Sequence, residues 1–285
     1  MRYPPMRFVT TIFLCVIGAS VSFAQNGASW QRDTEEFQPP LQLFHSTHGI
    51  NLPTAEVLQQ GNFEFEVSHR FVPRISDGSR HLWGFDGPSN IRLALGYAYH
   101  DDGYVTLGRS NVQDNLELAV KHQLFRWRNE TLPLLVAARI GGAWNGDVNE
   151  RGAGDARNFQ YYAQLIFNAM YAERLALGVV PSYVDNSRIM HRERQYSFVV
   201  GLHAQYYVTD VFNVVAEWIP TVTGWRTRHN TVAFGIELET GGHFFKIIAS
   251  NNELLNTAQL LAGATDSFDN GDLHIGFNIT RLLMF

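Results

Sequence analysis

The sequence predicts a transmembrane antiparallel β-barrel of about twelve strands, and three observations support this all-β fold. Period-two runs of apolar residues recur from Gly61 onward, tight and long links take turns between them, and an N-terminal export signal precedes them. Most of the runs have about 9–11 residues, the length a tilted strand needs to cross a bilayer. The predicted domains are a signal peptide (1–24), a periplasmic N-terminal segment (25–60) and an outer-membrane barrel (61–285).

Composition excludes several classes of protein. The 285 residues are 45% hydrophobic and 13% aromatic but only 17% charged, which is too aromatic for a disordered chain. The 22 Lys and Arg residues are outnumbered by 27 Asp and Glu residues, which argues against nucleic-acid binding. Beyond the N-terminus, no stretch approaches the ~20 unbroken apolar residues of a membrane-spanning helix.

Residues 1–24 have the three parts of a secretory signal peptide. Arg2 and Arg7 carry the positive charge, residues 8–21 are apolar, and small residues precede a cleavage site after Ala24. An N-terminal anchor helix is the alternative, but the apolar run is short. Cys15, the only cysteine, lies in this run, so the mature chain is expected to contain neither a disulfide nor a cysteine-ligated metal.

The remaining chain divides into twelve alternating strands, an even number. In the first strand, Phe63, Phe65 and Val67 alternate with Glu64 and Glu66, and the later strands repeat this pattern. The predicted strands are 62–72, 90–99, 103–109, 115–125, 134–144, 158–171, 175–183, 195–207, 212–220, 231–239, 243–250 and 272–285.

The links between the strands separate a membrane barrel from a soluble sandwich, whose strands also alternate. Tight links such as 100–103 and 241–242 take turns with long ones such as 73–89 and 251–270, and 110–114 is the exception. Outer-membrane barrels have this asymmetry, with short periplasmic turns and longer outer loops. Aromatic residues near strand ends are expected to form the interfacial girdles: Tyr97, Tyr99, Trp127, Trp144, Tyr171, Tyr183, Tyr206, Trp218 and Trp225.

Four stretches carry a family resemblance: GNFEFEVSHRF (61–71), GFDGPSNIR (84–92), ETGGHFF (239–245) and DLHIGFNITR (272–281). They resemble an uncharacterised family of outer-membrane β-barrel proteins defined only as a domain of unknown function. The similarity runs from about Phe44 to the C-terminus. It implies a barrel in the bacterial outer membrane and supplies no catalytic residue.

The strand faces opposite the aromatic ones are expected to line the lumen. They carry charges of both signs: Glu64, Glu66, Arg70, Arg92, Glu117, Lys121, Arg139, Glu217, Glu237, Glu239 and Lys246. One interpretation is a mutually paired network that fills a narrow barrel. The other is a polar channel whose opposed charges set selectivity.

Two further regions have open alternatives. Residues 25–40 are polar, and 41–60, with Phe44, His45 and His48, are expected to form either a periplasmic tail or a partial plug. Two neighbouring outer loops are basic and would form one cationic rim beside Trp225, which either attracts anions or is a solvated, internally paired surface. The rim residues are Arg188, Arg192, Arg194, Arg226 and Arg228.

The sequence predicts no catalytic site, no bound metal and no cofactor. Ser68 and His69 are sequence neighbours, so they point to opposite faces of a strand, and His45 and His48 have no further ligand nearby. The expected function is passage of small polar or charged solutes, with a closed structural or partner-docking barrel second and a rim-sited hydrolase third. The expected partners are outer-membrane lipid and lipopolysaccharide, the barrel-assembly machinery through the C-terminal strand, and a small solute, with a monomeric state and no nucleic acid.

Overall fold

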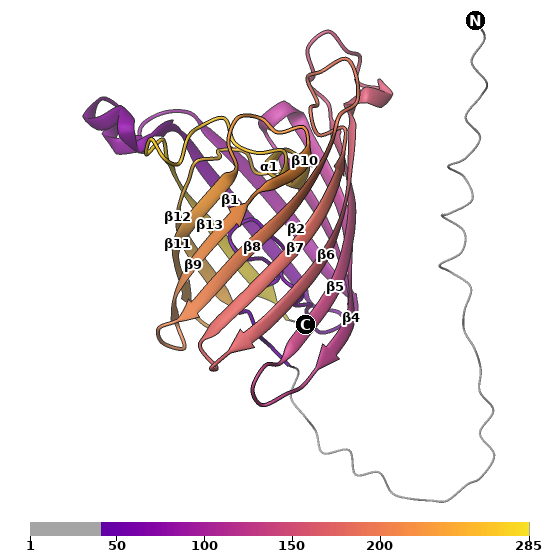
Figure 1. The fold of residues 1–285 in the computed structure, drawn as a ribbon, viewed down its shortest axis with the longest axis vertical. Coiled ribbons are helices and arrows are strands. Elements are labelled where there is room, and N and C mark those ends of the chain that lie inside the picture. Colours follow the sequence, from indigo (N-terminus) through magenta and orange to yellow (C-terminus); the bar gives the residue numbers. More distant parts are fainter. Residues whose placement is uncertain (1–40, 285) are drawn as a thin grey trace, which may run out of the picture. The chain divides into compact units, whose positions relative to one another are not determined.

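The computed structural model describes residues 41–284, which form a β-barrel with short helices in its loops (Figure 1). The predicted signal peptide (1–24) and the lead at 25–40 lie outside the described residues. Among the described residues, no helix is long and apolar enough to span a membrane.

The sheet has thirteen antiparallel strands, of which twelve form the closed barrel. The strands are β1 (Phe63–Arg74), β2 (Ser89–His100), β3 (Gly103–Ser110), β4 (Asn115–Trp127), β5 (Leu134–Asn145), β6 (Phe159–Tyr171), β7 (Leu175–Asp185), β8 (Tyr196–Tyr207), β9 (Phe212–Ile219), β10 (Thr221–Gly224), β11 (Thr231–Glu239), β12 (His243–Ser250) and β13 (His274–Leu283). Pairing of β1 with β13 and of β8 with β9 closes the ring, so no barrel strand is left with a free edge.

The twelve predicted strands all form, with ends that differ from the prediction by a few residues. The strand that the sequence did not predict is β10, which follows Pro220 and continues the pairing of β9 along β8. Proline lacks a backbone N–H and interrupts the ladder there. The predicted loop 221–230 therefore begins with a short strand.

The outward faces of the strands carry exposed apolar side chains around the barrel. Leu118, Ile140 and Ile247 are each more than half exposed, although they lie in the middle of their strands. An apolar belt of this kind around a closed barrel is the surface that hydrocarbon requires. His69 also faces outward and stacks on Phe277, with 4.8 Å between the ring centroids.

The two ends of the barrel differ. Tight turns connect the strands at the lower end in Figure 1, and long loops gather at the upper end, as the link lengths predict. The loops at the upper end contain η1 (Ile75–Gly84), η2 (Val112–Asp114), η3 (Ala156–Asn158) and α1 (Thr257–Leu261), of which η2 lies in the short link between β3 and β4. We call these ends the tight-turn end and the long-loop end.

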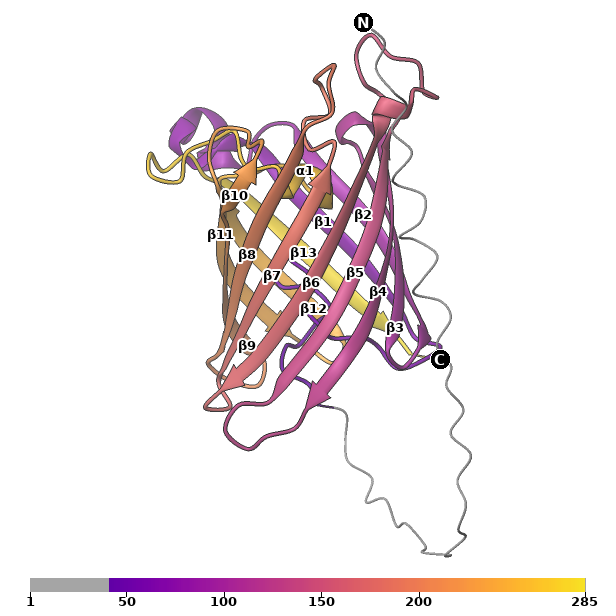
Figure 2. The ribbon, with the colours of Figure 1, turned by 45° about the vertical axis from the view of Figure 1, so that its right-hand side comes forward.

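Two segments of the chain lie inside the barrel. Residues 41–56, here the N-terminal plug, are visible in indigo through the strands in Figure 1, and 251–264, here the loop plug, carry α1 at the long-loop end in Figure 2. The plugs meet in one apolar cluster, where Leu52 packs with Leu260 and Leu261. Because the wall residues Tyr162 and Val199 complete this cluster, the interior has a packed core.

Candidate functional site: the plugged lumen

The N-terminal plug folds back on itself inside the barrel. The backbone N–H of Thr54 donates to the carbonyl of Thr47 at 3.0 Å, and that of Gly49 donates to the carbonyl of Leu52 at 2.8 Å. The tip of this turn, residues 49–52, is the part that reaches Glu217 in the wall. The plug therefore presents its own backbone groups to the lumen wall.

Glu217 and Arg70 hold the tip of the plug. The Glu217 carboxylate, which is 3% exposed, accepts the backbone N–H groups of Ile50, Asn51 and Leu52 at 2.6, 2.9 and 3.0 Å. The Arg70 guanidinium donates to the side-chain oxygen of Asn51 at 3.0 Å. Burial of a carboxylate is costly unless hydrogen-bond donors surround it. The backbone N–H groups of the plug supply such donors to Glu217.

Two lysines hold carbonyl groups of the plug. Lys246 donates to the carbonyls of His48 and Gly49 at 2.8 and 2.6 Å and pairs with Glu237 at 3.1 Å. Lys121 donates to the carbonyls of Thr47 and Thr54 at 3.2 and 3.0 Å. Its ammonium also lies 5.2 Å from the centre of the Tyr104 ring. Both ammonium groups are therefore satisfied largely by plug oxygens.

Glu64 completes this grip through side chains. Its carboxylate accepts the hydroxyl groups of Thr47 at 2.7 Å and Tyr104 at 2.9 Å. His45 of the plug lies 3.2 Å from the Glu237 carboxylate. The plug thus contacts charged groups on both sides of the lumen.

Glu117 links the wall to the loop plug. Its carboxylate pairs with Arg139 at 3.2 Å and Arg92 at 3.5 Å, and it accepts the Tyr162 hydroxyl at 3.0 Å. It also accepts both the backbone N–H and the hydroxyl of Thr257, each at 2.9 Å. Arg92 continues the network to Glu66 at 3.2 Å.

Ten of the eleven lumen residues named from the sequence are buried inside the barrel, five of each sign, and the exception is Glu239. Glu239 is half-buried beside the turn between β11 and β12, where it accepts the backbone N–H of Gly242 at 3.0 Å. Glu239 is on the same strand face as Glu237, but it is the last residue of β11. Its side chain therefore lies at the turn and not in the lumen.

Burial also shifts the pKa of two plug groups. It raises the pKa of the Glu56 carboxyl from 4.5 to about 7, although the N–H groups of Leu43 and Phe44 donate to it at 2.8 and 3.0 Å. Burial lowers the pKa of the His48 imidazole well below its ordinary value, and the charges of Lys121 and Arg139 act in the same direction.

Little space remains beside the plug. A cavity of about 20 Å³ lies between the plug tip and the wall at Glu66, Arg92 and Arg139. That volume holds about one water molecule. In this conformation the plugs and the wall occupy the section of the lumen where solute would pass.

Two groups of side chains among residues 41–284 have the spacing of cation ligands. His48, Glu64 and Glu66 form one, and Glu253, Asp266 and His274 at the long-loop end form the other. Arg92 pairs with Glu66 of the first group, and Lys121 bonds to the carbonyl of Thr47, next to His48. These two positive charges disfavour a cation at the first group. In the second, Arg74 already pairs with Asp266 at 2.7 Å.

Three of the five basic rim residues have different contacts in the structure. Arg194 pairs with Asp185 at 3.0 Å within its own loop, and Arg226 donates to Asn230 at 2.9 Å. Arg188 alone of the five has its guanidinium over Trp225, at 5.6 Å from the ring centre. The girdle prediction for Trp225 was wrong, because its ring lines a pocket between loops.

Neither the loop plug nor several of the residues that seat both plugs were predicted from the sequence. Glu56, Thr47 and Thr257 were not selected, since an isolated Glu or Thr in a loop carries no pattern. A signal was present on the lumen faces of β5, β6 and β7, where Leu135, Ile166 and Val180 are apolar. These residues pack against Leu43, Phe44 and Ala55 of the N-terminal plug, and an open aqueous lumen would not need them.

These features define a membrane β-barrel whose lumen is filled by two segments of its own chain. The chain belongs to the family described as a membrane bound beta barrel domain (DUF5777), which matches residues 44–283. The match confirms the family resemblance of the four sequence stretches. No protein of curated function is similar enough in sequence to count as a relative.

Three solved structures similar to this chain are a porin, an outer membrane channel and an outer membrane protein. The NanC porin is 8% identical with a TM-score of 0.46, and 78% of this chain covers 99% of that one. The COG4313 outer membrane channel from Pseudomonas putida F1 is 13% identical with a TM-score of 0.46, over 80% of this chain and 98% of that one. The Acinetobacter baumannii outer membrane protein Omp33 is 10% identical with a TM-score of 0.40, over 78% and 98%.

Proposed function

We propose that the protein is a channel of the bacterial outer membrane for small polar or charged solutes, closed in this conformation by the N-terminal plug. The observation that carries the proposal is the way the plug is held. Charged wall residues, above all Glu217, Lys121 and Lys246, bind its backbone N–H and carbonyl groups. Water and polar solutes offer the same donors and acceptors, so they can replace the plug without leaving these charges unsatisfied.

The asymmetry of the two ends gives the proposed orientation. Short turns face the periplasm and long loops face the exterior in outer-membrane barrels. The backbone N–H of Gln60, just after the plug, donates to Asp101 in the turn between β2 and β3 at 2.9 Å. In this orientation the N-terminal plug enters the barrel from the periplasmic side, and on opening it would leave the lumen toward the periplasm.

A disulfide that locks the plug tests the proposal in the full chain. The Cγ atom of Leu52 lies 3.4 Å from the position a Cβ atom would take on Gly201 of β8, so cysteines at these positions stand within disulfide reach. We expect the reduced Leu52→Cys/Gly201→Cys protein to show conductance steps in a planar bilayer and the oxidised protein to show none. Leu52→Cys alone is the control and should not respond to oxidation.

Removal of residues 41–56 is the second variant, and it should give the largest conductance.

The alternative function is a structural or partner-docking barrel with a closed lumen, favoured by the apolar cluster in which Leu52 meets Leu260 and Leu261. A folded deletion variant and a reduced cysteine pair that both fail to conduct would refute the channel and leave this alternative.

A further inference from the structure

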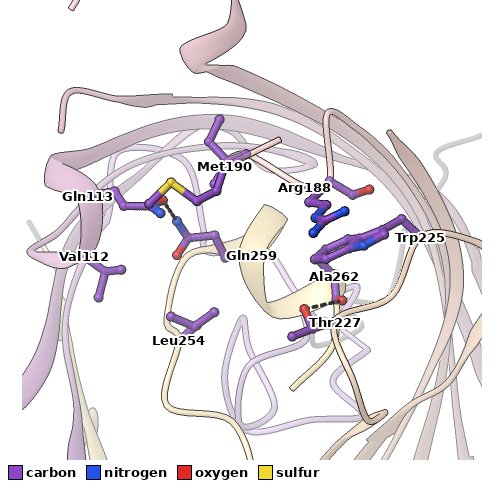
Figure 3. Close-up of a pocket in the computed structure, with 11 residues that line it drawn as sticks. Val112, Gln113, Arg188, Met190, Trp225, Thr227, Leu254, Gln259 and Ala262 are labelled. Atoms are coloured by element: carbon purple, nitrogen blue, oxygen red, sulfur yellow. Dashed lines mark hydrogen bonds between the residues drawn. The ribbon is translucent and has the colours of Figure 1, made fainter. Parts of the chain in front are cut away.

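A pocket of about 200 Å³ opens at the long-loop end, above the loop plug (Figure 3). Four separate loops form it, including η2 and the loop plug itself. Its lining combines the polar side chains of Ser187 and Gln259, the charged Arg188 and the ring of Trp225. Sites for drug-sized ligands are usually about 300–1,000 Å³, so this pocket suits a smaller molecule.

Two buried polar side chains in the pocket have a free hydrogen-bonding atom. Gln259 is 6% exposed and Ser187 is 3% exposed. Within residues 41–284, neither the Gln259 Oε1 atom nor the Ser187 Oγ atom has a hydrogen-bond partner. The Gln259 amide nitrogen is already bonded to Gln113, which fixes the amide and leaves its oxygen as an unfilled acceptor (Figure 3). Buried polar atoms are rarely left unpaired, so both atoms point to a ligand.

Arg188 supplies the charge of the site. Its side chain is exposed and lies over Trp225, opposite the Gln113–Gln259 pair in Figure 3. In the part of the chain that the structure describes, no carboxylate pairs with the Arg188 guanidinium, in contrast to Arg194. Apolar atoms of Val112, Met190 and Leu254 line the space between the two polar sides.

We propose that this pocket binds a small organic anion that has an apolar body and a hydrogen-bond donor. Arg188 and the Ser187 hydroxyl hold the carboxylate, the apolar side chains contact the body, and the Gln259 Oε1 atom accepts the donor. Arginine binds carboxylates through parallel N–H groups, which gives the site its preference for anions. This binding goes beyond the proposed channel and does not require the lumen to open.

Binding at this site would also hold the loop plug in place. Gln259 and Ala262 belong to the loop plug, whose Thr257 is bonded to Glu117 of the wall. A ligand on Gln259 therefore adds contacts to α1, the short helix of the loop plug. A ligand that binds only this seated form stabilises it.

The test is calorimetric titration of the detergent-solubilised full chain with 4-hydroxybenzoate, which has a carboxylate, a ring and a hydroxyl donor. We expect saturable one-to-one binding, weakened about tenfold or more by Arg188→Gln. Arg192→Gln is the matched control, because it removes the same charge from the same loop outside the pocket, and it should bind as the unmodified protein does. Gln259→Leu should abolish any preference for 4-hydroxybenzoate over benzoate.

Three results would overturn the proposal. They are the absence of saturable binding to the unmodified protein, equal binding by Arg188→Gln, and equally tight binding of inorganic phosphate, which has no apolar body. Binding of the neutral 4-hydroxybenzyl alcohol with the same affinity would be a fourth such result, because it would remove the role of Arg188. Because binding is measured without conductance, its failure is distinguishable from failure of the channel.

Discussion

Glu217 of strand β9 and Ile50 of the N-terminal plug are joined by a hydrogen bond of 2.6 Å from the Ile50 backbone N–H to the carboxylate. The same carboxylate oxygen accepts the N–H of Leu52. One wall residue therefore satisfies several consecutive backbone donors at the turn of the plug. Its contribution depends mainly on the position of the backbone, and the side-chain amide of Asn51 adds one further donor at 3.2 Å.

Glu217→Gln should loosen the plug. The amide keeps one acceptor but loses the charge, and its NH₂ group faces backbone donors, so we expect a loss of about 1.5–3 kcal/mol of docking free energy. The readout is the rate of maleimide labelling at a Ser46→Cys substitution, since Ser46 is buried in the plug. Labelling should become about ten- to a hundredfold faster. Glu239→Gln, away from the plug, is the control, and equal rates in both variants would contradict the role of Glu217.

Lys121→Glu should change ion selectivity once the plug is gone. The polar contacts of Lys121 are the plug carbonyls, so in a protein lacking residues 41–56 its charge faces the lumen. We expect the reversal potential in a salt gradient to move toward cation preference. Arg139→Glu should give a shift of the reversal potential that is harder to assign to charge alone. Arg139 is paired with Glu117, so reversing its charge also disrupts that ion pair. An unchanged reversal potential in Lys121→Glu would place this residue outside the conduction path.

Plug docking should weaken as the pH rises from 4.5 through 7, because of Glu56. Burial raises the pKa of this carboxyl from 4.5 to about 7, so the docked plug holds the proton more tightly than the released plug. The stabilising effect is complete below pH 4.5 and is lost above pH 7, with a size of about 3 kcal/mol at most. Labelling at Ser46→Cys should therefore accelerate between pH 5 and 8 relative to a Glu56→Gln background, after correction for thiol ionisation.

His48 acts in the opposite direction and makes the Glu56 comparison necessary. Its pKa is lowered by burial, so the docked plug loses stability as the pH falls below the ordinary histidine pKa of 6.5. The Glu56→Gln background keeps this contribution and removes only that of the carboxyl. Identical pH profiles with and without Glu56→Gln would show that this group does not titrate with docking.

Thr257→Val should loosen the loop plug without unfolding the barrel. The substitution removes the hydroxyl that donates to the buried Glu117 carboxylate at 2.9 Å and keeps the backbone contact. We expect a loss of about 1–2 kcal/mol, measured as faster hydrogen exchange in residues 251–264. The exposed Thr265→Val is the matched control. Unchanged hydrogen exchange in Thr257→Val would contradict the role of the Thr257–Glu117 contact in holding the loop plug.

The barrel could be predicted from the sequence because its strands follow a local rule. In strands such as β1, each residue faces lipid or lumen according to its parity, so Glu64 and Glu66 could be assigned to the interior without knowledge of their neighbours. The same rule fails where a strand ends or breaks. Glu239 lies at a turn, Trp225 lies in a pocket beyond the last strand residue, and Pro220 hides the continuation into β10.

The sequence by itself determined the closed sheet, the number of barrel strands and the charges that face inward. Only the tertiary structure decided that the lumen is occupied, and by which residues. The physical reason is that Glu217, Lys121 and Lys246 bind backbone N–H and carbonyl groups. Every residue has a backbone carbonyl, and every residue except proline has a backbone N–H. Such contacts leave no pattern in the side chains of the plug itself, so the choice between a periplasmic tail and a plug was decided by the positions of residues 41–56 in space.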